Sequence, residues 1–184
     1  TEDLTPTVSV GDFHVLELFR GPTSAFKDVA LCMLPHLLTA SKKLLQVKEP
    51  IRILTATSGD TGKAALCGFQ DVEGTEICVF YPHGGVSQVQ RAQMITQEGN
   101  NVSVCAVEGN FDDAQTGVKN IFAACQGKDL PFRLSSANSI NIGRLAPQIM
   151  YYFRSYRDLL DRGVISLGDK VNFSVPTGNF GDIL

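Results

Sequence analysis

The sequence has little of several features that would by themselves indicate a class of protein. Only three of its 184 residues are histidine, so a His-rich metal site is not expected. No apolar run approaches the roughly 18 residues that a membrane-spanning helix needs. The net charge of −3 gives no electrostatic reason to bind nucleic acid or an anionic membrane. We therefore expect no metal, no nucleic-acid partner and no membrane partner.

Cysteine is present in an odd number, five residues, and no pair has the two-residue spacing of a zinc or redox site. Cys32, Cys67, Cys78 and Cys105 lie inside apolar stretches. This context predicts buried structural thiols, which suits a reducing cytoplasm. We therefore expect the protein to be cytoplasmic.

The length and composition are those of an ordinary globular chain. Hydrophobic residues make up 43% and charged residues 19%, and a chain of this length can bury roughly 70% of its unfolded surface. The last apolar run, 171–175, leads into a glycine-rich turn that is followed by only two more residues. Because such a turn normally precedes a helix, we interpret the 184 residues as the middle of a larger enzyme.

Short apolar, β-branched runs alternate with helical patterns along the chain. The expected strands are residues 14–18, 51–54, 77–80, 102–107 and 171–175. Helices are expected at 87–97 and 111–125, with one apolar stripe over Phe26, Val29, Ala30, Met33, Leu34 and Leu37 and another over Leu145, Ile149, Phe153, Tyr156 and Leu160. Pro35 should kink or split the first of these stripes.

This alternation predicts an α/β fold with a parallel sheet. In such sheets, ligands bind at the carboxyl ends of the strands. The turns that follow the strands are therefore the places to look for chemistry.

The first such turn is 21–28, in which Thr23 or Ser24 can cap the next helix. Lys27 then falls in the first helical turn, where the helix dipole disfavours a cation by a few tenths to about 1 kcal/mol. With apolar neighbours such as Phe26, this field favours a lysine that is ready to lose its proton and bond covalently to a carbonyl compound. The alternative is a solvated surface lysine.

The second turn, 57–63, has two glycines and small hydroxyl residues directly after a strand, and can hold a carboxylate or phosphate. The alternative of a plain helix cap stays open. A nucleotide-binding P-loop is also conceivable, because Gly62 and Lys63 resemble its end. That motif needs glycine where Thr57 stands and a hydroxyl residue where Ala64 stands.

Two further turns gather polar groups. In 136–144, Arg144 could bind phosphate or carboxylate through two parallel hydrogen bonds. The alternative is that Asn138, Ser139 or Asn141 caps a helix and Arg144 faces water. In 178–182, two glycines allow the backbone to close around an anion.

Taken in order, these segments resemble the threonine synthases, pyridoxal-phosphate (PLP) enzymes of fold type II related to the tryptophan synthase β subunit. The matching segments are 18–28, 55–62, 81–87 together with Gln90, 138–141 followed by Arg144, and 176–182. The resemblance runs from about Leu16 to the last residue.

The resemblance implies an incomplete three-layer α/β/α fold, with a small domain at 51–134 inserted between large-domain segments 1–50 and 135–184. It implies a lyase that converts O-phospho-L-homoserine and water to L-threonine and phosphate. A threonine-synthase-like phospholyase acting on another phosphorylated amine is the near alternative, and a nucleotide-binding α/β module is the remote one. The 184 residues alone are expected to be inactive, and their exposed surfaces could self-associate.

The resemblance also assigns residues to roles. Lys27 would bind PLP covalently and then move protons on the substrate. The cofactor-binding residues would be Lys27, Phe26, Gly178, Asn179, Phe180, Gly181 and Asp182. The substrate-binding residues would be Ser58, Gly59, Asp60, Thr61, Gly62, Asn138, Ser139 and Arg144.

Asp60 stands where related PLP enzymes carry an asparagine near the pyridine oxygen. A carboxylate there would repel that oxygen at low dielectric. We therefore expect Asp60 to be turned away, protonated, or hydrogen-bonded to the backbone.

Overall fold

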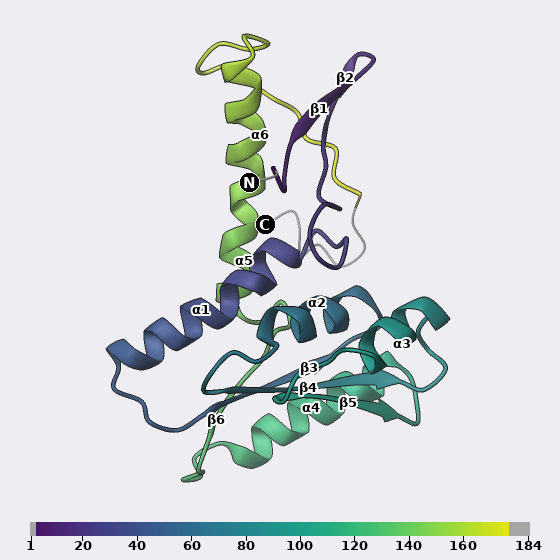
Figure 1. Cartoon of the computed structure of the whole chain (residues 1–184), viewed down its shortest axis with the longest axis vertical. Coiled ribbons are helices and arrows are strands. Elements are labelled where there is room, and N and C mark those ends of the chain that lie inside the picture. The colour runs from purple at the N-terminus through teal and green to yellow at the C-terminus, as the bar shows by residue number, and fades with distance from the viewer. Residues whose placement is uncertain (1–2, 177–184) are drawn as a thin grey trace.

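The computed structural model describes residues 3–176, which form one four-stranded sheet, one hairpin and the helices around them (Figure 1). The strands are β1 (Thr7–Val10), β2 (Phe13–Leu16), β3 (Ile51–Ala56), β4 (Thr75–Pro82), β5 (Val102–Val107) and β6 (Arg133–Ser135). The helices are α1 (Asp28–Leu44), α2 (Asp60–Phe69), α3 (Gln88–Ile95), α4 (Phe111–Cys125), α5 (Ile142–Leu145), the 3₁₀ helix η1 (Ala146–Ile149) and α6 (Met150–Asp161). None of the described helices is long and apolar enough to cross a membrane.

The main sheet is parallel throughout, with strand order β5-β4-β3-β6. Helices α1 and α2 contribute to the core on one face, while α4 packs on the other, as Figure 1 shows. This confirms the expected three-layer α/β/α arrangement. It brings the turns after β3 and β6 to the same edge of the sheet, because these strands are neighbours.

Helix α1 shares one hydrophobic core with the sheet and α2. The fully enclosed members include Leu31 and Leu34 of α1, Ile53 of β3, and Leu66 and Phe69 of α2. Burying side chains of this size stabilises the fold by roughly 1.5–3 kcal/mol each. The helix that follows Lys27 is thereby fixed to the sheet that carries the other turns.

Pro35 lies inside α1, and the helix continues through it, so of the two expected effects, a kink or a split, the split does not occur. A proline lacks the N–H that would bond the carbonyl four residues earlier, which here belongs to Leu31. That carbonyl instead faces Gly68 of α2, where an added Cβ would lie only 2.1 Å from the Leu31 oxygen. The close approach of α2 supports the helix at the point where its own bond is missing.

Gly68→Ala is therefore expected to lower the free energy of unfolding by about 1–3 kcal/mol or more, because the added methyl collides with backbone. Gly117→Ala, in open space on α4, is the matched control and should change stability by no more than about 1 kcal/mol, towards greater stability. Urea unfolding of both variants tests this. Equal stability of the two variants would mean that α1 and α2 can move apart to admit the methyl group without a loss in the free energy of unfolding.

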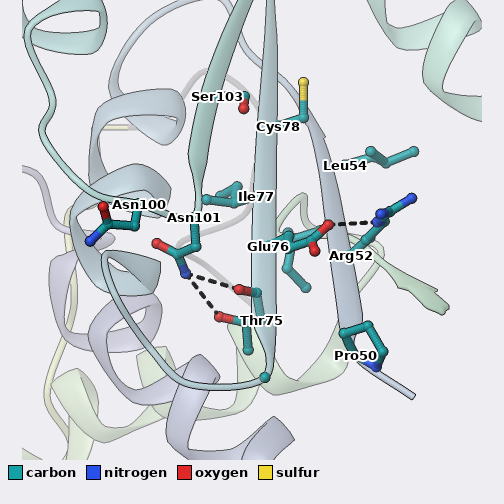
Figure 2. A pocket seen from close by; sticks show the side chains of 12 residues that line it. Pro50, Arg52, Leu54, Thr75, Glu76, Ile77, Cys78, Asn100, Asn101 and Ser103 are labelled. Carbon is teal, nitrogen blue, oxygen red and sulfur yellow. Dashed lines mark hydrogen bonds and ion pairs between the residues drawn. The ribbon is translucent and has the colours of Figure 1, made fainter.

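On the face of the sheet under α4, the described residues that pack with the helix include Leu54, Ala56, Phe80 and Val107, in the carboxyl half of the strands. At the amino half lies a hollow of about 520 Å³ (Figure 2). In it, Arg52 bonds Glu76 at 2.6 Å, and the Asn101 amide donates to the Thr75 carbonyl at 3.0 Å. Several of its polar groups are thus paired with one another, and it lies at the end of the sheet opposite to the predicted site.

The cysteines are less buried than expected. Cys105 is exposed and the other four are partly buried, all as free thiols. Cys105 lies on β5, one of the two edge strands of the sheet, which explains its exposure. Burial nonetheless raises the pKa of Cys32 and of Cys78 above the ordinary thiol value.

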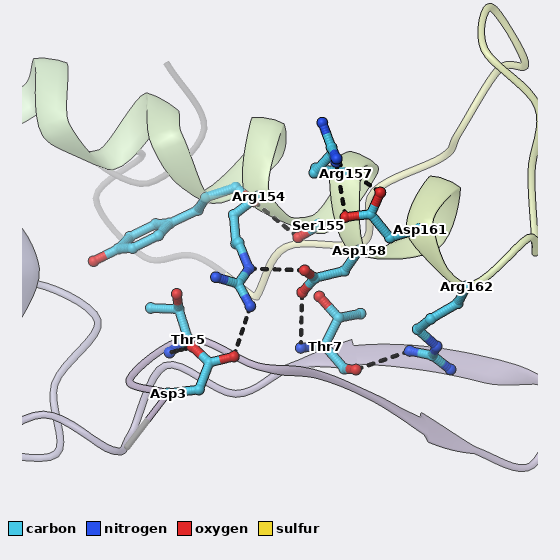
Figure 3. A network of polar contacts seen from close by, with 10 residues as sticks. Asp3, Thr5, Thr7, Arg154, Ser155, Arg157, Asp158, Asp161 and Arg162 are labelled. Atoms are coloured by element: carbon cyan, nitrogen blue, oxygen red, sulfur yellow. Dashed lines mark hydrogen bonds and ion pairs between the residues drawn. The ribbon is translucent and has the colours of Figure 1, made fainter. Parts of the chain in front are cut away.

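A second layer of contacts fixes the N-terminal hairpin to α6 (Figure 3). Strands β1 and β2 pair antiparallel, and the Thr7 N–H donates to Asp158 at 3.3 Å. Arg154 bridges Asp158 at 2.8 Å and Asp3 at 2.6 Å. Strand β1 was not expected from the sequence, whereas β2 overlaps the expected strand 14–18.

Three further expectations about the helices and strands were wrong. Residues 171–175 form no strand, because no described strand lies beside them to complete a ladder. Met33 and Leu37 are exposed, because the buried line of α1 runs through Leu31, where α2 crosses. On α6, Phe153 is 68% exposed and Tyr151 is buried instead.

Candidate active site

Lys27 lies at the N-cap position of α1, one residue before the helix begins. The sequence suggested that Thr23 or Ser24 caps the helix, but neither does. Instead, the Asp28 carboxylate accepts hydrogen bonds from the N–H of Thr23 at 2.9 Å and of Ala25 at 3.3 Å, and from the Thr23 hydroxyl. Ser24 takes a φ of 56°, an uncommon value for a non-glycine residue. Asp28 thus holds the tight turn that presents Lys27.

The Lys27 side chain is buried, with 9% of its area exposed. Its Nζ lies 3.8 Å from Asp60 Oδ2 and 4.4 Å from the centre of the Phe26 ring. The carboxylate and the aromatic face partly offset the free energy that a buried ammonium loses when it gives up its hydration. The structure therefore excludes the alternative of a solvated surface lysine.

Tyr151 of α6 holds the Lys27 turn from the other side. Its phenol donates a hydrogen bond to the carbonyl oxygen of Phe26. Burial, with smaller contributions from Asp28 and Cys32, raises the pKa of Tyr151 well above its ordinary value, so the phenol stays a donor. Neither Tyr151 nor Asp28 was recognised from the sequence as a supporting residue, because no local pattern links Tyr151 to residue 26.

Tyr151→Phe is expected to lower the free energy of unfolding by roughly 1–2 kcal/mol, because the Phe26 carbonyl loses this donor. The control is Tyr156→Phe, whose hydroxyl is exposed and accepts from the Gly168 N–H at 2.8 Å, and which should cost less than about 1 kcal/mol. Chemical denaturation followed by circular dichroism compares the two. A larger loss in the control would contradict the role given to Tyr151.

The loop after β3 is organised around the buried hydroxyl of Thr57. This oxygen accepts from the N–H groups of Gly59 and Gly62, each at 3.0 Å, and donates to the Gly59 carbonyl. The N–H groups of Asp60 and Thr61, in the first turn of α2, have no intrahelical partner and are suited to an anion. Lys63, which a P-loop would aim at phosphate, instead contacts Gln97 at 2.5 Å.

Asp60 is held by a side chain rather than by the backbone. Its Oδ1 accepts from the Gln90 amide at 2.9 Å while its Oδ2 faces Lys27. Gln90 also closes a capping box with Ser87 at the start of α3. The sequence signal for that box, serine followed three residues later by glutamine, is present, but the link to Asp60 has no sequence signal.

The loop after β6 lies beside the loop after β3. The Asn138 amide accepts from the Ala56 N–H at 3.1 Å and donates to the Ala56 carbonyl at 2.8 Å, so it extends the end of β3. Ser139 is exposed. Asn141 caps α5 by accepting from the Gly143 N–H at 2.9 Å, which settles the capping alternative in favour of Asn141.

Arg144 is buried, with only 1% of its area exposed, so the alternative of a solvated guanidinium was wrong. One nitrogen, Nη1, donates to the Ala137 carbonyl at 3.1 Å. Nε and Nη2 are buried and donate to no atom of the described residues, 3–176. Desolvation lowers the pKa of Arg144 to about 10. A buried cation with two unused donors is poised to bind an anion.

The described residues fit a PLP enzyme in part. A buried lysine, an anion-ready helix start and an unsatisfied guanidinium meet at one edge of the sheet. Gly178, Asn179, Phe180, Gly181 and Asp182, which were assigned to the cofactor, lie outside the described residues. What is present can hold a carbonyl cofactor by an amine and bind two separate anionic groups.

Comparisons with known proteins place these features in context. No family model matches the chain. It is 48% identical over 176 residues to a threonine synthase from Pseudomonas aeruginosa, covering 94% of this chain and 35% of that protein. It is 42% identical to human threonine synthase-like 1, covering 95% of this chain and 24% of that protein. The chain thus spans about a quarter to a third of these curated relatives.

Solved structures agree with the sequence comparison. A PLP-bound threonine synthase from Brucella melitensis superposes with a TM-score of 0.80 at 41% identity, covering 97% of this chain and 37% of that chain. An O-ureido-L-serine synthase superposes with a TM-score of 0.60 at 18% identity, which shows the shared fold alone.

Proposed function

Because the chain belongs to the threonine synthase family of PLP-dependent, fold type II enzymes, we propose that the protein containing it converts O-phospho-L-homoserine and water to L-threonine and phosphate. Its relatives are about three to four times as long, so the activity is proposed for the full-length protein. The chain would supply the cofactor lysine and the two anion-binding loops.

The observation that carries this proposal is the buried Arg144 guanidinium with its unsatisfied Nε and Nη2. An amino acid without a phosphate would leave these donors unpaired, at a cost of roughly 1–3 kcal/mol each. A phosphorylated amino acid supplies the oxygens they need. This favours a phospho-substrate over the substrate of a simple amino-acid dehydratase.

Each loop then has a defined task. Lys27 would hold PLP through its Nζ, and the same amine would hold and move a proton of the substrate. The carboxylate of the substrate would meet Ser58, Gly59, Thr61 and Gly62. Its phosphate would meet Asn138, Ser139 and Arg144. PLP, when bound, supplies the electron sink that lets the γ-phosphate leave.

Several wider expectations belong to the same proposal. The division at residues 50 and 134 assigns the Lys27 turn and the Arg144 loop to the large domain and the loop after β3 to the small one. The 184 residues alone would be inactive, since they span only about a third of relatives such as the Pseudomonas aeruginosa enzyme. The full-length protein would work in the cytoplasm.

Self-association of the isolated 184 residues is expected through apolar side chains that are exposed here. Phe13, Phe153 and Leu167 are among the most exposed of them. Contiguous exposed apolar area favours association.

The proposal is tested by adding PLP to the full-length protein, reducing with borohydride, and mapping the modified lysine by mass spectrometry. A single adduct on Lys27 is expected. Adducts spread over many lysines, or on any lysine other than Lys27, would contradict the assignment.

The chain is 42% identical in sequence to human threonine synthase-like 1, which supports a second candidate function, a phospholyase that acts on another phosphorylated amine. Turnover of O-phosphohomoserine against other phosphorylated hydroxy-amines separates the two. Preference for O-phosphohomoserine, with release of threonine, supports the synthase.

A further inference from the structure

The side-chain amide of Gln90 has a partner at both ends. Its Oε1 accepts from the Ser87 N–H at 3.3 Å, and its Nε2 donates to Asp60 Oδ1 at 2.9 Å. A backbone N–H can only donate, so it fixes the oxygen end of the amide and turns the nitrogen end towards Asp60. A flipped amide would place its oxygen against a carboxylate. The contact between α3 and Asp60 is therefore directional.

The same amide packs directly on the loop after β3. A Cβ added at Gly59 would lie 2.4 Å from Gln90 Nε2. Gly59 thus leaves room for the Gln90 side chain, and the amide touches both the backbone of the loop and its carboxylate. Two independent contacts of one side chain fix where α3 and the start of α2 lie relative to each other.

The second oxygen of Asp60 faces the cofactor lysine, 3.8 Å from Lys27 Nζ. Asp60 is 55% exposed, and an ion pair that is open to water on one side adds little to stability. The contact instead fixes the orientation of the Asp60 carboxylate. With Oδ1 held by Gln90, the Asp60 carboxylate presents Oδ2 to the amine.

We propose that Gln90 is a positioning residue for Lys27, acting through Asp60. Its amide holds the loop after β3 in register with the amine that takes up PLP, so a residue of α3 sets the geometry of cofactor attachment. This inference rests on the proposed function. A neutral amide suits the task because it satisfies one carboxylate oxygen without adding a charge that would compete with Lys27.

The test measures the initial rate at which PLP becomes trappable by borohydride on Lys27 in the full-length protein. Gln90→Met removes both hydrogen bonds and should slow trapping about tenfold, the size expected for one lost hydrogen bond to a charged group. Gln90→Glu keeps the acceptor for the Ser87 N–H but opposes two carboxylates, and should slow trapping at least as much.

Ser87→Ala is the matched control. It removes the hydroxyl that caps α3 through the Gln90 N–H, but it leaves the Ser87 N–H that orients the Gln90 amide. It should lower the midpoint of thermal unfolding and leave the trapping rate unchanged. A slowing equal to that of Gln90→Met would show that α3 stability alone matters and would overturn the inference.

Action through Asp60 is tested by a double-mutant cycle. In an Asp60→Ala background, Gln90→Met should have no further effect on the trapping rate. Additive effects of the two substitutions, or a normal trapping rate in Gln90→Met, overturn the inference about Gln90. In that case, trapping of PLP on Lys27 by the unmodified protein still supports the proposed function. If the unmodified protein gives no adduct on Lys27, both fail together.

Discussion

Replacing Lys27 by alanine in the full-length protein is expected to abolish the covalent hold on PLP and to slow conversion of O-phosphohomoserine at least about a thousandfold. The amine both attaches the cofactor and moves protons, and general acid–base catalysis alone contributes up to about ten-thousandfold. The Lys27 side chain is buried beside Asp60, so no solvent base can readily take its place.

Lys63→Ala is the control for this variant. Lys63 lies on α2 three residues after Asp60, but its amine contacts Gln97. It should keep the adduct and the turnover of the unmodified protein. Comparable loss in both variants would mean that charge near α2, rather than the specific amine, supports the reaction.

Replacing Arg144 by methionine is expected to have opposite effects on stability and on binding. Without ligand, the guanidinium is buried with two unsatisfied donors, so its removal should raise the free energy of unfolding by about 1–2 kcal/mol. With ligand, the loss of two charge-assisted hydrogen bonds should weaken binding of the phospho-substrate about a hundredfold.

Urea unfolding and a binding titration with O-phosphohomoserine measure the two effects separately. Arg157→Met is the control, since Arg157 is exposed and pairs with Asp161 on α6 at 2.8 Å. It should change stability by less than about 1 kcal/mol and leave binding unaltered. A less stable Arg144→Met protein with normal affinity would show that the guanidinium is structural.

The sequence predicts the parts of this molecule whose signals are local. Strand β5 and helix α4 have the bounds expected for them, because β-branched alternation and an amphipathic pattern each end at clear turns. The turns that follow strands likewise draw attention to Lys27 and to Arg144, whose roles stay predictions. Both were picked out from residue type and position in the chain.

What the sequence does not predict depends on contacts between distant segments. The buried line of α1 passes through Leu31 because α2 crosses there at Gly68. Three helices supply the contacts around Lys27: Asp28 and Tyr151 bond the turn that carries it, and Asp60 faces its amine. No pattern within α6 marks Tyr151 as the support for residue 26, so such residues appear only once the chain is folded.

The bond from Tyr151 to Phe26 has a consequence for the order of folding events. It joins residues 125 positions apart, and everything from β3 to α5 lies inside the loop that it closes. Contacts of such long range form after local ones, because the chain entropy of the loop must be lost first. We therefore expect the turn that carries Lys27 to be completed late, and PLP to be captured by a chain that has already formed its sheet.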